Sequence, residues 1–314
     1  MRTTLAVTAV VAAVGIGFAA GRVKPAQAVP EEHAGHDMAA MNASVVVPQT
    51  PGIPASGAGA KERLEKSPRH GEWVAIKVNA TDSVMAWVVY PERRDKAPVV
   101  IAIHENTGIN TWTRNVADQL AADGFIGIAP DLTTMFRTTD LRQDPTQEEG
   151  RAAIPKVTAD IGNAIIDAVA KYGASLPSST GKVGIVGFCW GGGRSFGYAV
   201  HNPNLGASVV YYGSPPSAAD MANIKAPVLG FYGGNDARIT STVFPTDSTM
   251  KALGKSYQFQ VYDGAGHGFL RAQNDVAANA AATPQQLDAG KANQMAAQAA
   301  WPRTVAFFRE KLGK

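Results

Sequence analysis

Residues 182–193, with the sequence KVGIVGFCWGGG, decide the fold of this chain. They begin with a short, mainly apolar run that predicts a buried strand, and residues 194–200 predict the first turns of a helix. A strand, a tight turn with one reactive side chain at its centre and a helix make up a nucleophile elbow, usually written G-x-S-x-G. Here the pattern is G-x-C-x-G, with Cys189 at the centre.

The glycines on either side of Cys189 have a steric explanation. The central residue of an elbow is expected at a positive φ, and Gly187 and Gly191 leave space that side chains would fill. The thiol would then lie at the N-terminus of the next helix, where unpaired N–H groups favour a thiolate and can receive an oxyanion. Taken alone, the stretch also fits an ordinary turn around an inert buried cysteine.

The composition favours a single large α/β domain. The chain has 314 residues, 45% of them hydrophobic, with 32 Gly and 19 Pro. The net charge is only +3 with 18% charged residues, which provides no electrostatic footprint for nucleic acid. We therefore expect no nucleic-acid partner.

Strands and helices alternate from about residue 72, which predicts a mainly parallel central sheet with helices on both faces. Besides the elbow strand, strands are predicted at 73–78, 84–90, 98–104, 125–129, 207–212, 227–232 and 257–262. Helices are predicted at 113–123, 157–172 and 301–312. The long polar connection 132–152 is typical of a lid or pocket wall.

Residues 1–28 have the pattern of a secretory signal peptide. Arg2 precedes an apolar stretch over 5–20, and Ala26-Gln27-Ala28 predicts cleavage before Val29. The alternative is an uncleaved membrane anchor, for which the apolar stretch is short. We expect a periplasmic or secreted protein without stable membrane association after cleavage.

Residues 29–60 are predicted to form a flexible linker, which leaves 61–314 as the folded domain. The linker contains His33, His36, Met38 and Met41, whose side chains could bind copper weakly. The simpler alternative is that these four residues have no ligand. In the domain itself we expect no metal and no cofactor, and we expect a monomer.

Two polar side chains after later strands complete a candidate catalytic set with Cys189. Asp236 follows the strand predicted at 227–232, and His267 lies between glycines after the last strand. The order nucleophile, acid, histidine is that of α/β hydrolases, in which the acid holds the imidazole and the imidazole serves the nucleophile. Asp263 is an alternative orienting acid, although it is close to His267 in sequence.

The loop after the strand at 98–104 is a candidate oxyanion loop. It reads His104-Glu105-Asn106-Thr107-Gly108. In this topology such a loop supplies one N–H of the oxyanion hole, here that of Asn106. The second would come from Trp190, the residue after the nucleophile.

Taken together, these stretches resemble the dienelactone hydrolase (carboxymethylenebutenolidase-like) family of α/β hydrolases. The resemblance spans roughly residues 70–314. It implies an α/β-hydrolase fold and a Cys-His-Asp triad of Cys189, His267 and Asp236, acting on a small-molecule ester or lactone. The matching stretches are residues 104–108, 129–132, 187–192, 232–236 and 264–271.

The resemblance also implies roles for charged residues around the thiol. Glu105 would contact the thiol and keep it unreactive until substrate arrives; the alternative is a structural carboxylate paired with an arginine. Arg271 would bind a carboxylate of the substrate. Arg151 is our choice for a second binding arginine, with Arg137 as the alternative.

Two other functions remain compatible with the sequence. One is a general short-chain carboxylesterase that needs no carboxylate on its substrate. The other is a secreted, non-catalytic binding protein that uses the His/Met segment for metal.

Overall fold

The computed structural model of the protein describes residues 49–313. The predicted signal peptide at 1–28, its cleavage site and the His/Met segment at 33–41 lie outside the described residues. No helix of the described part is both long enough and apolar enough to cross a membrane.

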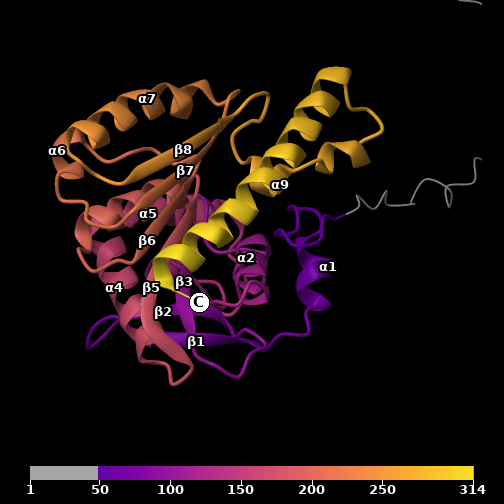
Figure 1. Cartoon of the computed structure of the whole chain (residues 1–314). Coiled ribbons are helices and arrows are strands. Elements are labelled where there is room, and N and C mark those ends of the chain that lie inside the picture. The colour runs from indigo at the N-terminus through magenta and orange to yellow at the C-terminus, as the bar shows by residue number, and fades with distance from the viewer. Residues whose placement is uncertain (1–48, 314) are drawn as a thin grey trace, which may run out of the picture. The chain divides into compact units, whose positions relative to one another are not determined.

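One eight-stranded sheet forms the centre of the domain (Figure 1). Its strands follow one another in the order β1-β2-β4-β3-β5-β6-β7-β8. The pairs β1–β2 and β2–β4 are antiparallel, and every other neighbouring pair is parallel. The strands are β1 (Gly71–Lys77), β2 (Ser83–Val89), β3 (Ala97–Ile103), β4 (Ile126–Pro130), β5 (Ser179–Phe188), β6 (Ala207–Tyr211), β7 (Val228–Gly233) and β8 (Tyr257–Tyr262).

Helices cover both faces of the sheet and bury two separate apolar cores. On one face α2 and α9 pack against β3 to β7, and on the other α4 and α5 pack against the same strands. Alternate residues of a strand serve opposite cores, as in β3, where Val100 and Ala102 face α2 while Val99 and Ile101 face α4. The larger helices are α2 (Thr111–Ala122), α4 (Ala159–Ser175), α5 (Trp190–His201), α7 (Ala237–Ala252) and α9 (Pro284–Leu312).

The structure confirms the predicted α/β-hydrolase architecture. The predicted strands correspond to β1–β8, with ends that differ by a few residues. The closing helix is much longer than the predicted 301–312, because α9 already begins at Pro284. Thr283 and Gln286 form a capping box there, and Pro302 is accommodated inside the helix rather than in its first turn.

The prediction that the linker extends to residue 60 is wrong at its C-terminal end. Ile53 and Ala55 are buried, and the Trp112 indole N–H donates to the Ala55 carbonyl at 3.0 Å. The side-chain amide of Gln273 donates to the Pro54 carbonyl at 2.9 Å. This segment leads into the short helix α1 (Ala60–Glu65). The segment has too few apolar residues to show a period in the sequence. It is buried because elements distant in the sequence provide the surfaces that cover it.

The connection at 132–152 consists largely of short helices and turns. It contains the short helices η2 (Thr134–Phe136) and α3 (Gln147–Ala153), and η3 (Ile154–Lys156) follows. A Cβ on Gly150 of α3 would lie 1.9 Å from the carbonyl oxygen of Thr107, so only glycine allows this approach. The connection therefore packs directly on the candidate oxyanion loop.

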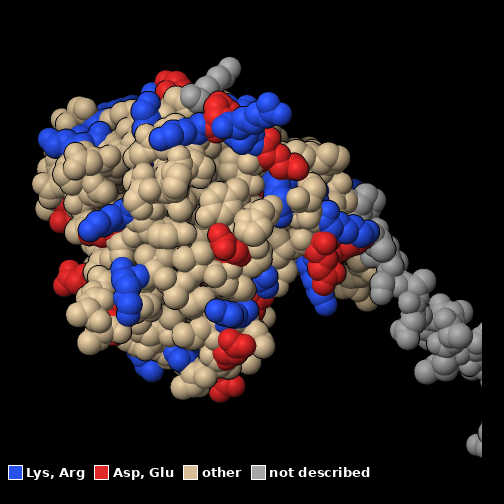
Figure 2. All heavy atoms as spheres, turned by 90° about the horizontal axis from the view of Figure 1, so that it is seen from below, with Lys and Arg blue, Asp and Glu red and all other residues tan. Residues whose placement is uncertain are grey.

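Charged side chains of both signs are interspersed over the face of the molecule in Figure 2. This mixture agrees with the small net charge of the chain.

Candidate active site

The elbow has the strained geometry expected from its glycines. Cys189 lies between β5 and α5 with φ +56° and ψ −115°. A Cβ on Gly187 would lie 1.9 Å from the Gly191 carbonyl oxygen, and one on Gly191 would lie 2.3 Å from the His104 carbonyl oxygen. The Cys189 amide donates to the Tyr211 carbonyl at 3.1 Å. Close backbone packing thus holds the thiol at the first turn of α5, whose N–H groups lack partners within the helix.

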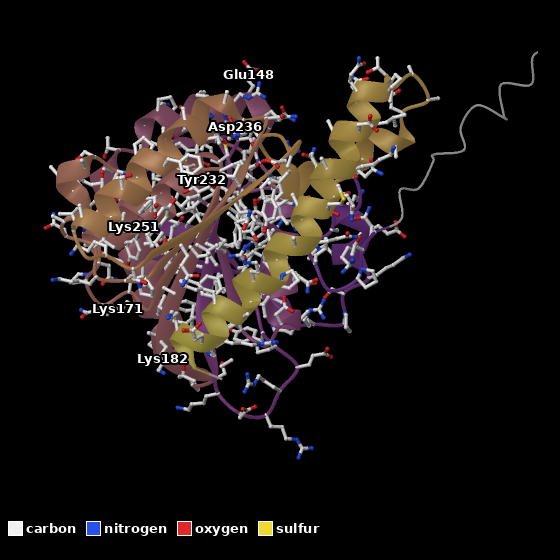
Figure 3. The ribbon with its side chains drawn as sticks, turned by 45° about the horizontal axis from the view of Figure 1, so that its top comes forward. Glu148, Lys171, Lys182, Tyr232, Asp236 and Lys251 are labelled. Carbon is white, nitrogen blue, oxygen red and sulfur yellow. The ribbon has the colours of Figure 1, made fainter. Side chains whose placement is uncertain are left out.

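Asp236 and His267 meet above the carboxyl ends of β7 and β8. Figure 3 labels Asp236 at this edge, beyond Tyr232 of β7. The His267 Nδ1 lies 2.5 Å from Asp236 Oδ2, which leaves Nε2 as the nitrogen for another partner. Asp236 is buried, while the His267 side chain is 33% exposed. The alternative acid, Asp263, is exposed and is not the partner of the imidazole.

The thiol of Cys189 interacts with this imidazole. Hydrogen bonding with Cys189 raises the pKa of His267 to about 9, with a further contribution from Asp236, while burial acts in the opposite direction. The three side chains lie after the carboxyl ends of β5, β7 and β8, which the fold brings to one edge of the sheet. A raised pKa favours the imidazolium, which is the form of His267 after it has accepted the thiol proton.

A cavity of about 560 Å³, here called the Cys189 cavity, opens at the thiol. Asn106 and Trp190, whose amides were predicted to form the oxyanion hole, both line it. The Trp190 ring stacks on the buried His104 imidazole, with ring centroids 5.4 Å apart, and the Arg194 guanidinium lies 4.7 Å from the centroid of the Trp190 ring. The remaining lining residues are Ile154, Gly193, Tyr212, Ser214, Pro215, Arg238 and Ile239.

Glu105 and Arg271 form an ion pair beside the triad. The Arg271 Nε lies 2.8 Å from Glu105 Oε2, and the Glu105 side chain is only 10% exposed. Burial raises the pKa of Glu105, and the charges of Arg271 and His267 act against that rise. Glu105 therefore lies close to the triad, but in this structure its partner is an arginine, as in the alternative considered above.

The structure does not bring the other predicted arginines to the cavity. Arg151 lies on α3, where it is exposed and bonds Gln147 at 3.3 Å. Arg137 is fully buried at its side chain and pairs with Asp131 at 2.6 Å. It also donates to carbonyls of the loop that follows it, at Leu141 among others. Arg137 thus stabilises the 132–152 connection and is not available to a ligand.

Arg194, Arg238 and Tyr212 are among the cavity residues that escaped the sequence reasoning. Arg194 lies one turn after the nucleophile on α5, and Arg238 lies in the first turn of α7, just after Asp236. Their proximity in sequence to Cys189 and Asp236 is a signal that could have identified them. Tyr212 gave no such signal, because it follows β6 without a recognisable motif.

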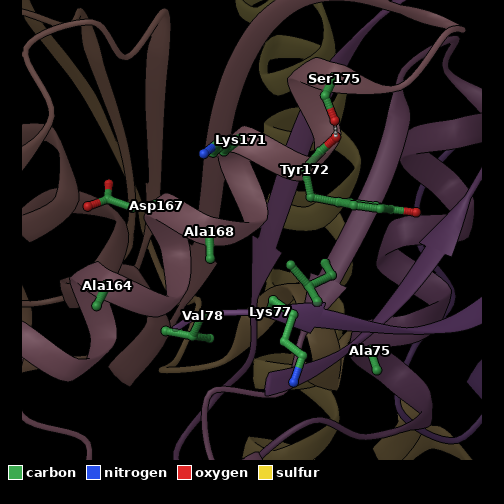
Figure 4. Close-up of a pocket in the computed structure, with 10 residues that line it drawn as sticks. Ala75, Lys77, Val78, Ala164, Asp167, Ala168, Lys171, Tyr172 and Ser175 are labelled. Carbon is green, nitrogen blue, oxygen red and sulfur yellow. Dashed lines mark hydrogen bonds between the residues drawn. The ribbon is translucent and has the colours of Figure 1, made fainter. Parts of the chain in front are cut away.

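A second cavity of about 630 Å³, here called the β1–α4 cavity, is drawn in Figure 4, and no member of the candidate triad lines it. Lys77 of β1 and Asp167, Lys171 and Ser175 of α4 are among its lining residues. Asp167 already accepts a hydrogen bond from Tyr198 and contacts His201. The cavity is not lined by a cysteine or a histidine, so it is a weaker candidate for covalent chemistry.

Among residues 49–313, no three His, Cys, Asp or Glu side chains are grouped in a way that could hold a metal ion.

Comparison with known proteins identifies similar chains. "Putative carboxymethylenebutenolidase" of Escherichia coli K12 is 32% identical over 248 residues, which cover 74% of this chain and 84% of that protein. The protein of the same name from Salmonella typhimurium is 35% identical over 60% of this chain and 74% of its own length. The crystal structure of "Putative Dienelactone Hydrolase" from Klebsiella pneumoniae superposes with a TM-score of 0.63 at 26% identity, covering 77% of this chain and 99% of that one.

The sequence model of the dienelactone hydrolase family matches residues 84–312, which include every strand from β3 to β8 and all members of the candidate triad. The chain is a hydrolase that belongs to the dienelactone hydrolase family.

Proposed function

We propose that this hydrolase is a secreted cysteine enzyme that cleaves small ester or lactone substrates through Cys189, His267 and Asp236. One observation carries the proposal: a single imidazole bonds a buried carboxylate, and its pKa is raised by the only thiol of the chain. An acid that orients the imidazole, and an imidazole that serves the nucleophile, are the requirements for nucleophilic catalysis.

The first half of the reaction acylates the enzyme. The thiol proton of Cys189 moves to Nε2 of His267, and the thiolate attacks the carbonyl carbon to form a C–S bond. The amides of Trp190 and Asn106 donate to the resulting oxyanion, and each such donor lowers the barrier by about 3–4 kcal/mol in typical enzymes. When the C–O bond breaks, His267 returns the proton to the leaving alkoxide.

The second half hydrolyses the thioester. Water attacks the acyl carbon as His267 accepts its proton, and the C–S bond then breaks. The product leaves as a carboxylic acid, and the proton returns to the Cys189 sulfur. Asp236 stabilises the imidazolium in both halves, because its carboxylate lies 2.5 Å from Nδ1.

The charges at the cavity favour a substrate with an anionic group. Arg194 and Arg238 line the cavity, and burial lowers the pKa of Arg194, as expected for a cation without a compensating carboxylate. Arg271 could bind the same substrate only after Glu105 releases it. At rest Glu105 keeps Arg271 paired, and burial raises the pKa of Glu105 while the charges of Arg271 and His267 lower it.

The experiment that tests the triad is the Cys189→Ala substitution, assayed with a panel of lactones and p-nitrophenyl esters. We expect kcat/KM to fall by about 10⁴-fold because no other thiol exists to form the acyl intermediate. Lys171→Ala, in the β1–α4 cavity, is the control and should keep full activity. Unchanged ester hydrolysis by Cys189→Ala would exclude the mechanism.

The same panel separates the alternatives. A general carboxylesterase would hydrolyse neutral and anionic esters equally well. A non-catalytic binding protein would hydrolyse neither.

Secretion rests on the sequence of residues 1–28 alone. Cell fractionation with N-terminal sequencing tests it: the mature protein should begin at Val29 and appear outside the cytoplasm.

A further inference from the structure

Two adjacent tyrosines at the end of β6 have opposite surroundings, although both are fully buried. The Tyr211 hydroxyl lies 2.7 Å from the Thr304 hydroxyl of α9 and shares a hydrogen bond with it. The Tyr212 hydroxyl is buried and has no hydrogen-bond partner among residues 49–313. Buried hydroxyls are normally paired, so an unpaired one requires an explanation.

The backbone of Tyr212 is strained. Its φ is +41°, in a region that bulky residues rarely adopt, and the other non-glycine residues with positive φ in the described chain are Cys189 and Gln273. Strain of this kind persists where the surrounding structure holds a side chain in a functional position. The Tyr212 amide bonds the Phe231 carbonyl at 2.8 Å, which anchors the strained residue to β7.

The Tyr212 side chain is directed at the triad. Its ring centroid lies 5.1 Å from that of His267, and the residue lines the Cys189 cavity. The charges of Glu105, Arg271 and Cys189 all act on its hydroxyl. Burial raises the pKa of Tyr212 well above its usual range, so the hydroxyl keeps its proton and can only act as a neutral hydrogen-bonding group.

We propose that Tyr212 is a further catalytic residue, whose hydroxyl donates a hydrogen bond to the Cys189 thiolate once His267 has accepted the thiol proton. This rests on the proposed function. The Tyr212 proton stays on its oxygen throughout, and the only proton that moves is the one from sulfur to Nε2. Glu105, although charged and nearby, already accepts from Arg271 at rest, whereas the negative charge on sulfur appears only during the reaction.

The location of the oxyanion donors supports this choice. Trp190 and Asn106 serve the oxygen of the substrate, and neither amide is needed for the sulfur. A thiolate in a partly buried site gains from each charge-assisted hydrogen bond that it accepts. An unpaired donor in the cavity that the thiol also lines is available for such a bond once negative charge develops on the sulfur.

The test compares Tyr212→Phe with Tyr211→Phe in the purified protein without substrate. The readout is the rate of Cys189 alkylation by iodoacetamide as a function of pH. We expect Tyr212→Phe to move the midpoint of this profile upward by about one pH unit, the size of one charge-assisted hydrogen bond, and to lower kcat/KM for esters by about ten-fold. Its melting temperature should not fall, because no hydrogen bond of the resting protein is lost.

Tyr211→Phe should show the reverse. It loses the bond to Thr304, so its melting temperature should fall by about 2–4 °C while the alkylation profile stays that of the wild type. A wild-type alkylation profile in Tyr212→Phe would overturn the proposal. Because alkylation needs no substrate, this result is independent of the Cys189→Ala assay, which tests the proposed function itself.

Discussion

The Cys189 cavity and the β1–α4 cavity have similar volumes, about 560 and 630 Å³, but the chain around them is built differently. The β1–α4 cavity is lined by a regular strand and a regular helix, and none of its lining residues has a positive φ. The Cys189 cavity has two strained residues, Cys189 and Tyr212, and a lining drawn from many separate elements.

The two cavities also differ in whether their buried polar groups already have partners. In the β1–α4 cavity Asp167 is already held by Tyr198 and His201. In the Cys189 cavity the Tyr212 hydroxyl is unpaired, and the cation of Arg194 is partly desolvated. Volume alone therefore does not distinguish the cavity of the candidate active site. Strain and an unpaired polar group that occur together in one cavity do, because such costs are concentrated at functional sites.

The strain at Cys189 can be tested by adding one carbon. In Gly187→Ala the new Cβ would lie 1.9 Å from the Gly191 carbonyl oxygen, so the elbow must shift. We expect a loss of about 3 kcal/mol in the free energy of unfolding and most of the esterase activity. Urea denaturation and an ester assay measure the two effects.

Gly197→Ala is the matched control on the same helix, α5. A Cβ there meets no atom within 4 Å, and its φ is not positive, so we expect a gain of about 0.5–1 kcal/mol with activity unchanged. If Gly187→Ala and Gly197→Ala had the same free energy of unfolding, the elbow would be no more strained than the regular part of α5.

The charge difference between the cavities can be tested through Arg238. Arg238→Ala removes an exposed guanidinium that lines the Cys189 cavity, and it leaves the Trp190–Arg194 contact intact. We expect kcat/KM for a carboxylate-bearing ester to fall by about ten-fold, which is close to one charge-assisted bond, while a neutral ester is unaffected. Steady-state kinetics on an acidic and neutral ester pair provide the measurement.

Arg151→Ala, on α3 away from the cavity, should change neither substrate. An equal loss on both esters in Arg238→Ala would instead favour the general carboxylesterase.

The smallest expected effect concerns pH. The pKa of His267 is raised from 6.5 in an unperturbed imidazole to about 9 in the folded protein, so the folded state binds its proton more tightly than the unfolded state does. The resulting stabilisation is fully present below about pH 6.5 and is lost as pH rises through about 9. Denaturation of the wild type and His267→Gln at pH 6, 7.5 and 9.5 should show a difference in stability that narrows with rising pH. A difference that widens with pH would contradict the raised pKa.

Local patterns predicted much of the fold and the centre of the site. Short apolar runs, alternating along the chain with helical segments, predicted where the strands lie. The elbow could be identified because steric rules confine a short motif to one geometry, and Gly187 and Gly191 meet the backbone as those rules require. The order of Cys189, Asp236 and His267 was sufficient to propose a triad.

The sequence alone determined the architecture, the candidate nucleophile and the candidate base, because those features depend on residues close together in the chain or on a known order of elements. Only the tertiary structure decided between Asp236 and Asp263, paired Glu105 with Arg271, and replaced Arg151 by Arg194 and Arg238 at the cavity. It also showed that the Tyr212 hydroxyl is buried and unpaired while that of Tyr211 is bonded. These are contacts between side chains that are remote in sequence, and their distances depend on how whole strands and loops pack, which no local pattern encodes.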